Sequence, residues 1–566
     1  MFGKTAGEAL VDLLIDWEVE HIYGMPGDSI NSIIEALRKK QDKIKFIQVR
    51  HEEAGALAAA AYAKLTGKLG VCMAIAGPGA IHLLNGLYDA KLDKAPVLAI
   101  SGQVETDLLG TDFFQEVNLE RLFDDVAVYN QRIMSAEQLP AVVNQAIRMA
   151  YTKKGVSVLT IPDDVPKFEI KSGARVTNTS FTLPELFPQE EDLHAAKLAI
   201  NEAKKPVILA GKGAKHARES LLTFAEHIGA PIVLTLPAKG IIPDEHPLCI
   251  GGLGLIGTKP SYDAMKHADT LIMIGTSYPF TGFLPEKAKT IHIDTDPAQI
   301  GKRYVTDIGL AGDADKTLKW LIDNVEKHED HSFLEYHQEM MKKWEEKLHN
   351  QEEDASTPIK PQRVLHALQQ VAQDDAILSV DVGNVTVWTA RHFRMTNQQF
   401  IISSWLATLG CGLPGALAGK IAFPDKQVFA VCGDGGFGMT MNDFVTAVKY
   451  KLPIVVVVLN NNKIAMIKFE QEVMGNIEFG TDLTNPDFAK YAEACGGIGY
   501  RVENVDELLP AFESAVKQNR PCIIDVVVDA NEAPMPAKIT FGQAAGYTKH
   551  MIKELFEEGK IDLPPL

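Results

Sequence analysis

The sequence is 566 residues long, and since a domain typically has about 100 to 200 residues, this length predicts three or four domains. The composition, 46% hydrophobic and 23% charged, is typical of ordinary globular domains and excludes a disordered or fibrous chain. A formal net charge of -18 at pH 7, without a basic stripe, argues against nucleic acid as a partner and favours small-molecule ligands.

The cysteines and the apolar runs favour a cytoplasmic protein. The six cysteines are scattered without a C-x-x-C pair, which argues against a disulfide framework or a zinc site and favours a reducing compartment. Acidic residues such as Glu8 and Asp12 interrupt the apolar positions near the N-terminus, which argues against a signal peptide. No apolar run approaches the roughly 18 residues of a membrane span.

The first part of the chain alternates short apolar runs with helical patterns. We expect helices over residues 6–16, from 29 onward and over 52–65, with strands at 21–23 and 46–49. Such alternation is typical of a parallel sheet covered by helices.

Two further series of the same kind follow, and polar connectors separate them. The fold class is therefore α/β, with three tandem parallel-sheet domains at residues 1–180, 181–340 and 341–530, followed by a C-terminal tail at 531–566. Three domains of similar size are also compatible with distant copies of one unit. The remaining expected strands lie at 206–210, 231–234, 270–274, 290–293, 376–380, 428–431, 454–459 and 522–528, and the connectors at 168–191 and 327–361.

A candidate cation site follows two neighbouring strands of the third domain. A Gly-Asp-Gly-Gly run at 433–436 follows one strand, and three asparagines at 460–462 follow the next. A carboxylate and a carboxamide at two strand ends can bind a hard cation, while glycines let backbone N–H groups approach a phosphate. Taken singly, each run would be a turn or a loop. The pair together indicates a ligand site at the carboxyl edge of the sheet.

This pair of runs resembles the metal-binding motif of the thiamin-diphosphate enzymes. The resemblance implies that Asp434, Asn461 and the backbone oxygen of Lys463 bind Mg²⁺. It makes the third domain the diphosphate-binding domain. The implied contacts to thiamin diphosphate are Gly383, Asn384, Ala407, Thr408, Leu409, Asp434, Gly435, Gly436 and Lys463, with Leu409 as the aliphatic wedge that bends the cofactor. Without the resemblance, Leu409 would be a core leucine in a glycine-rich turn.

Arg50-His51-Glu52-Glu53 follows a strand and opens an alanine-rich helix. A glutamate there is commonly only a helix N-terminal charge. The run also resembles the Arg-His-Glu-Glu element of the thiamin-dependent oxidases and synthases. This implies that Glu52 bonds the pyrimidine nitrogen, so that the cofactor's own amino group becomes a base, and that the first domain binds the pyrimidine. In that family the glutamate faces a cofactor held by the other subunit, which implies a homodimer as the minimal unit and a homotetramer as the assembly.

The middle domain has strand ends suited to a flavin nucleotide. Residues 211–214 read Gly-Lys-Gly-Ala, but His216 stands where a dinucleotide fingerprint has its third glycine. Asp294 ends a strand, where a carboxylate can bind an adenosine ribose. These segments resemble the FAD domain of pyruvate oxidases. The implied FAD contacts are Gly213, Gly254, Leu255, Ile256, Thr276, Ser277, Tyr278, Pro279, Phe280, Asp294 and Asp313.

Four positions distinguish among the thiamin enzymes. Non-oxidative pyruvate decarboxylases carry a pair of adjacent histidines in the stretch that corresponds to residues 111–116, which here includes Phe114 and Gln115 and no histidine, so simple aldehyde release is disfavoured. Acetolactate synthases share the Phe-Gln-Glu element but typically have tryptophan at the position of Glu470, where pyruvate oxidases have glutamate. Met466 departs from the oxidase pattern, which has an aromatic residue there. Together with Glu52, these four are the candidate catalytic and pocket residues.

The resemblance favours oxidative decarboxylation of pyruvate to CO₂ and acetate or acetyl phosphate, with thiamin diphosphate, Mg²⁺ and FAD as cofactors and quinone or oxygen as acceptor. Two alternatives stay open: an acetolactate synthase, and a catalytically inert scaffold of the same fold. In the tail, five apolar residues recur at helical spacing. They predict either core packing or peripheral contact with the inner face of the cell membrane, and they are Tyr547, Met551, Ile552, Leu555 and Phe556.

Overall fold

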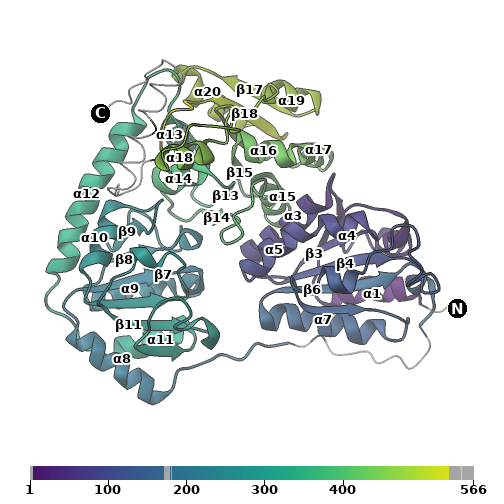
Figure 1. Cartoon of the computed structure of the whole chain (residues 1–566), viewed down its shortest axis with the longest axis horizontal. Helices are drawn as coiled ribbons and strands as arrows, with labels where there is room; N and C mark the ends of the chain where they lie inside the picture. Colours follow the sequence, from purple (N-terminus) through teal and green to yellow (C-terminus); the bar gives the residue numbers. More distant parts are fainter. Residues whose placement is uncertain (1–3, 171–178, 180, 535–549, 551–566) are drawn as a thin grey trace.

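The computed structural model describes residues 4–170, 179, 181–534 and 550, and it contains three six-stranded parallel sheets flanked by helices (Figure 1). The expected α/β class with three tandem parallel sheets is confirmed. In Figure 1 the first unit lies at the lower right, the middle unit at the lower left and the third unit at the top. Within the described ranges, every helix is too short or too polar to traverse a bilayer. The apolar stripe expected in the tail lies outside those ranges.

The first unit begins at a helix whose start is set by local chemistry. Thr5 and Glu8 form a capping box, in which the Thr5 hydroxyl accepts the Glu8 N–H at 3.2 Å. The sheet order is β2-β1-β3-β4-β6-β5. The strands are β1 (His21–Gly24), β2 (Lys45–Gln48), β3 (Gly70–Ala74), β4 (Val97–Gln103), β5 (Ala127–Arg132) and β6 (Val156–Pro162). The helices are α1 (Ala6–Asp16), α2 (Asn31–Lys39), α3 (Glu52–Thr66), α4 (Pro78–His82), α5 (Leu84–Leu92), α6 (Leu119–Leu122) and α7 (Leu139–Lys153).

The third unit repeats the strand order of the first. Its order, β14-β13-β15-β16-β18-β17, is the same when strands are counted within each unit. The strands are β13 (Ile377–Val380), β14 (Gln399–Ile401), β15 (Val428–Gly433), β16 (Val455–Asn460), β17 (Ile498–Val502) and β18 (Cys522–Val527). The helices are α13 (Pro361–Val371), α14 (Asn384–His392), α15 (Gly412–Ala422), α16 (Asp434–Thr440), α17 (Phe444–Lys449), α18 (Ala465–Val473), α19 (Phe488–Ala494) and α20 (Val505–Ala515).

The middle unit has a different sheet, ordered β12-β11-β10-β7-β8-β9. Counted within the unit and read from the other edge, this is the 3-2-1-4-5-6 order of dinucleotide-binding folds, with the switch point between β7 and β10. The strands are β7 (Pro206–Ala210), β8 (Ile232–Leu234), β9 (Cys249–Gly252), β10 (Thr270–Ile274), β11 (Lys289–Asp294) and β12 (Ile308–Ala311). The helices are α8 (Glu190–Glu202), α9 (Arg218–His227), α10 (Lys259–His267) and α11 (Ala314–Asn324).

The charged segment expected to be a connector at 327–361 is mostly a long helix. α12 (Ser332–Glu352) runs along one side of the molecule, from the middle unit to the third (Figure 1). Near its end Glu352 is buried and accepts hydrogen bonds from Arg394 at 2.7 Å and His392 at 2.9 Å. Both partners lie far from Glu352 in sequence, so the hydrophobic periodicity of residues 327–361 does not predict that this segment is ordered.

The first and third units share one hydrophobic core. Buried alanines of α3 pack against α15, and the same cluster continues into both sheets. Small side chains let the two helices approach closely. The carboxyl edges of both sheets, where ligands bind in such folds, are therefore held in a fixed relation.

Candidate functional site

Asp434 starts α16 at the end of β15 and is the most enclosed of the predicted metal ligands. Its carboxylate is only 2% exposed and accepts the Gly435 N–H at 3.0 Å and the Asn485 side-chain amide at 2.8 Å. Burial raises the pKa of Asp434 to about 6, although these donors oppose the rise. A hard cation beside this carboxylate would supply the positive charge that neutral N–H donors lack.

Asn485 joins Asp434 to the asparagine loop. The same amide group of Asn485 lies 3.1 Å from Asn460 Oδ1 and 3.2 Å from Asn462 Oδ1. Asn461 Oδ1 accepts a hydrogen bond from the backbone N–H of Lys463, two residues later in the loop, at 3.1 Å. The two predicted strand ends are thus brought together as an oxygen-rich group, which suits Mg²⁺. Sequence reasoning missed Asn485.

A pairing between two loops fixes the backbone of Lys463. Ile464 N donates to Thr481 O at 2.8 Å, and the Lys463 ammonium pairs with Glu478 and Asp482 at 2.6 Å each. The lysine side chain is therefore engaged away from the site. Its backbone carbonyl is the candidate ligand in this residue.

A second buried carboxylate, Asp381, organises the segment that carries Leu409. Asp381 directly follows β13 and accepts the N–H of Gly410 at 2.9 Å. Burial raises its pKa to about 6. A Cβ on Gly436 would lie 2.8 Å from Asp381 Cγ, so this glycine is needed for the close approach of α16. Gly383, with φ +118, is the N-cap of α14 and lies two residues after Asp381. The candidate contacts at 383–384, 407–410 and 435–436 therefore share one edge.

Glu52 forms a separate group at the start of α3. It is buried, and its Oε2 lies 2.9 Å from Nδ1 of His82 in α4. The ring of His51 stacks on that of His82, with centroids 4.3 Å apart. His82 was missed by sequence reasoning, although α4 follows β3 at the same sheet edge as Glu52. Both imidazoles and the carboxylate offer ligand atoms within 4.8 Å of one another.

Side-chain amides and backbone groups tie the Glu52 group to the third unit. Asn85 donates to Glu53 Oε1 at 2.6 Å and to Thr408 Oγ1 at 2.9 Å. The Arg50 N–H donates to Asp443 Oδ1 at 2.8 Å, in the turn that follows α16. The residues beside Glu52 therefore help to position the segment of Leu409.

Strained backbone coincides with several predicted positions. Gln115, Ala407 and Asn462 have φ values of +63, +55 and +54, a left-handed region that costs a non-glycine residue about 1–2 kcal/mol. Strain of this kind clusters at functional sites. The Gln115 carbonyl would be 2.8 Å from a Cβ on Gly77, which places this loop against the α4 region that carries His82.

Among the remaining pocket candidates, Phe114 and Glu470 are exposed in this single chain, and Gln115 and Met466 are half-buried. Phe114 is 74% exposed beside Gln115. Met466 and Glu470 lie four residues apart on α18, so they share one face of that helix. Lys468, on another face, is buried and hydrogen-bonds to Asn531. In the single chain, Phe114 does not lie in a closed pocket. Phe114 lies on the first unit and Glu470 on the third.

The predicted flavin contacts gather at the switch point of the middle sheet. A Cβ on Gly211 would be 2.4 Å from Gly275 O, and one on Gly213 would be 2.7 Å from Gly275 Cα. The loops after β7 and β10 can therefore lie in contact only because Gly211 and Gly213 have no side chain. The following residues, Thr276, Ser277, Tyr278, Pro279 and Phe280, line the end of β10, with Phe280 exposed.

Three further flavin candidates flank these loops: a glycine and two carboxylates that have local partners. Gly254 has φ +98, and its Cβ would be 2.6 Å from the buried Tyr278 hydroxyl. Asp294 ends β11 and accepts the Asp296 N–H at 2.9 Å. Asp313 caps α11 and lies 2.7 Å from His216 Nε2. Asp294 is thus at the edge where a ribose would bind, whereas Asp313 is occupied by helix capping.

Three family models match the chain in order. They are described as the N-terminal TPP binding domain, the central domain and the C-terminal TPP binding domain of thiamine pyrophosphate enzymes, and they cover residues 4–122, 193–321 and 381–526. The chain belongs to the thiamine pyrophosphate enzyme family. In this family member, Glu52 lies in the N-terminal match, and the Asp434 group lies in the C-terminal match.

Relatives of this thiamine pyrophosphate enzyme carry three kinds of name. It is 54% identical to the "Putative thiamine pyrophosphate-containing protein YdaP" of Bacillus subtilis (strain 168), over 100% of this chain and 99% of that protein. It is 39% identical to the pyruvate oxidase of Lactiplantibacillus plantarum, over 94% and 90%. It is 33% identical to the acetolactate synthase large subunit of Corynebacterium glutamicum, over 94% and 88%. The chain is thus a thiamine pyrophosphate-dependent enzyme of the pyruvate oxidase and acetolactate synthase group.

Proposed function

We propose that this enzyme oxidises pyruvate: CO₂ leaves, the acetyl group passes to water or phosphate to give acetate or acetyl phosphate, and two electrons pass to FAD and then to quinone or oxygen. The observation that carries the proposal is the presence of two strand-edge sites in one chain. One is the oxygen-rich group at Asp434, and the other is the pair of glycine loops at Gly213 and Gly275. The 39% identity to a named pyruvate oxidase supports the same choice.

In this proposal the third unit holds the metal and the diphosphate. Asp434, Asn461 and the backbone oxygen of Lys463 bind Mg²⁺ through the hard oxygen ligands that this ion prefers. Bound thiamin diphosphate supplies the carbon centre that adds to the keto group and takes up the charge left when CO₂ departs. The diphosphate lies against Gly383, Asn384, Gly435 and Gly436, and Ala407, Thr408 and Leu409 shape the rest of the cofactor.

Glu52 holds a proton at the pyrimidine nitrogen. Its burial keeps bulk water from competing for that hydrogen bond, and the contact of His82 with Oε2 fixes the direction of the carboxyl group. His82 is thereby a positioning residue for Glu52.

Substrate binds where two copies of the chain meet. Phe114 and Gln115 of one copy and Met466 and Glu470 of another would enclose the keto acid, with Glu52 at one side. The joint exposure of the adjacent Phe113 and Phe114 side chains in the single chain supports this, because contiguous exposed apolar patches mark interaction surfaces. The smallest active form is then a homodimer, and the proposed assembly is a homotetramer.

FAD lies across the carboxyl ends of β7, β10 and β11. Gly213 faces its diphosphate, and Asp294 accepts from the ribose hydroxyls. When bound, FAD would accept the electron pair that stays on the substrate-derived carbon after CO₂ leaves. The other proposed contacts are Gly254, Leu255, Ile256, Thr276, Ser277, Tyr278, Pro279, Phe280 and, at the periphery, Asp313.

An acetolactate synthase is the second candidate function. The chain is 33% identical to a named synthase, and Met466 stands where the oxidase pattern has an aromatic residue. The third candidate is not an enzyme: it is a catalytically inert scaffold of the same fold.

The deciding experiment follows the absorbance of the purified protein loaded with thiamin diphosphate, Mg²⁺ and FAD. We expect anaerobic pyruvate to bleach the flavin band and an added dye to be reduced. Accumulation of acetolactate with an unbleached flavin would replace the oxidase by the synthase. Glu52→Gln should lose the reaction while Glu35→Gln, at an exposed position on α2, keeps it. Equal turnover in Glu52→Gln would remove Glu52 from its assigned role.

A further inference from the structure

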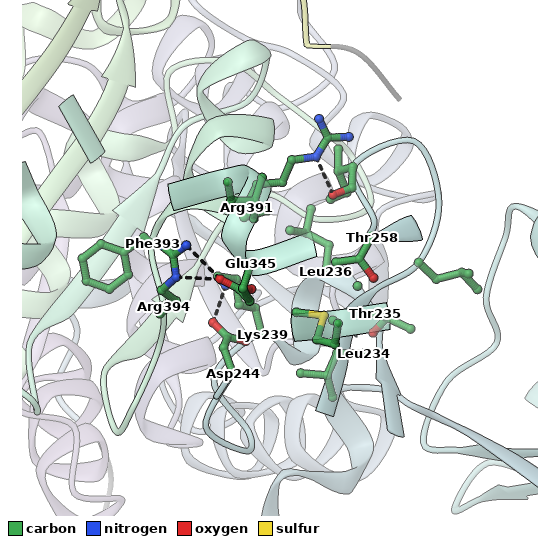
Figure 2. A pocket seen from close by; sticks show the side chains of 17 residues that line it. Leu234, Thr235, Leu236, Lys239, Asp244, Thr258, Glu345, Arg391, Phe393 and Arg394 are labelled. Atoms are coloured by element: carbon green, nitrogen blue, oxygen red, sulfur yellow. Dashed lines mark hydrogen bonds and ion pairs between the residues drawn. The ribbon is translucent and has the colours of Figure 1, made fainter. Parts of the chain in front are cut away.

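Arg391 joins the third unit to the middle unit at a loop that we assign to FAD. It lies near the end of α14, is 9% exposed, and donates from Nη2 to Leu255 O at 2.8 Å and from Nε to Ile256 O at 3.3 Å. Figure 2 shows this side chain reaching across to the loop. Both acceptors are backbone carbonyls, so the contact fixes the path of the loop and leaves the Leu255 side chain exposed.

The other end of α14 lies at the proposed thiamin diphosphate site. Asn384 begins the helix, and about two turns, or about 10 Å, separate it from Arg391. The Thr386 hydroxyl donates to Asp381 O at 2.8 Å, which ties the first turn to the carboxylate that holds Gly410. A single short helix therefore spans the distance between the two cofactor edges.

The surroundings of Arg391 leave the loop room to move. A cavity of about 50 Å³ lies beneath the loop, lined in part by Gly252, Leu253, Ile256 and Arg391 (Figure 2). Gly254 and Gly257 flank the contact and give the backbone conformational freedom. Loss of the guanidinium would let the loop shift into this space, because a glycine-rich backbone resists displacement only weakly.

We propose that Arg391 is a positioning residue that couples the two cofactor sites. The diphosphate against Gly383 and Asn384 fixes the start of α14, and Arg391 transmits that order to the flavin loop at 254–257. By reciprocity, FAD strengthens binding of thiamin diphosphate by the same factor. This inference rests on the proposed function, since it requires both cofactors to bind.

The test is a four-state binding cycle on the full-length protein. The dissociation constant of FAD is measured by flavin fluorescence with and without thiamin diphosphate and Mg²⁺, in the wild type, Arg391→Gln and Arg391→Lys. We expect the wild type to bind FAD at least about five-fold more tightly when thiamin diphosphate is present. In Arg391→Gln this ratio should fall to about one. Arg391→Lys, which keeps the charge but not the two-pronged donor, should give an intermediate ratio.

Arg363→Gln is the matched control. Arg363 also donates to a backbone carbonyl, that of Glu352, at 2.9 Å, but it lies on α13. We expect this variant to keep the wild-type ratio. An unchanged ratio in Arg391→Gln, or a wild-type ratio of one, would overturn the coupling even if FAD affinity itself changes. If Arg391→Gln does not fold, Arg391→Lys decides the question. A ratio in Arg391→Lys equal to that of the wild-type protein would overturn the coupling. A wild type that binds neither cofactor would refute the proposed function and this inference with it.

Discussion

Lys64 provides the strongest test of how the first and third units are held together. Its ammonium is buried on α3 and pairs with Asp89 at 2.7 Å and with Asp93. It also donates to Ile402 O at 3.1 Å, in the third unit. Asp93 in turn accepts the Ser404 N–H at 3.2 Å. One cation therefore compensates two buried carboxylates and bridges two units.

We expect Lys64→Met to lower the free energy of unfolding by about 5 kcal/mol. Breaking one buried pair costs about 3–5 kcal/mol because a charge stays buried without compensation, and here two carboxylates are left. In a unit of about 150–250 residues this corresponds to a fall in Tm of about 10–20 °C. Burial raises the pKa of Asp89, and Lys64 opposes that rise. Without Lys64 the folded state favours the protonated acids, so the loss should be smaller at pH 5 than at pH 8.

The assay is thermal unfolding followed by intrinsic fluorescence at both pH values. Lys91→Met is the matched control, because Lys91 pairs with Asp125 at 2.8 Å on the surface, where Asp125 is 74% exposed. Such a pair contributes about 0–1 kcal/mol. If Lys64→Met and Lys91→Met unfold within about 2 °C of each other, the buried pair does not hold the units as we describe.

Three further predictions concern the edge around Asp381. Asp381→Ala leaves the Gly410 N–H unpaired, at about 1–3 kcal/mol, so Tm and thiamin diphosphate affinity should fall further than in Asp381→Asn; equal losses would contradict this. Ala407→Gly removes the cost of the left-handed backbone conformation at this position, about 1–2 kcal/mol, so Tm should stay the same or rise. Pyruvate-dependent dye reduction should become slower. A lower Tm would show that Ala407 is not strained. Gly436→Ala should abolish cofactor binding measured by calorimetry, whereas Gly438→Ala, whose Cβ has open space, should retain it; similar affinities would refute the clash with Asp381.

Local periodicity was enough to locate most regular elements. The expected bounds of α1, β7 and β10 agree with the structure, because apolar spacing and caps act within a few residues. The sequence of α12 predicts a connector because it is charged along most of its length. What orders it is burial of a few side chains, such as Leu334 and Leu348, against other units, and that signal is not local.

The candidate site was only partly predictable for the same reason. Asp434 and Asn461 lie in short motifs, so they could be found from spacing. His82, Asp381 and Asn485 act on residues that are 30, 29 and 51 positions away, namely Glu52, Gly410 and Asp434. No short pattern encodes such pairs. Their importance follows from the parallel sheets, which bring distant strand ends to one edge.

The contact between α3 and α15 has an evolutionary consequence. Each helix follows the second strand of its own sheet, and the two sheets have the same strand order. Equivalent surfaces meeting each other are the mark of an isologous dimer, here enclosed within a single polypeptide. Such a chain behaves as a fused pair of subunits whose halves have diverged, one opening its helix with Glu52 and the other preceding its helix with Leu409. A larger side chain on one of these helices should therefore be compensated by a smaller one at the matching place on its counterpart.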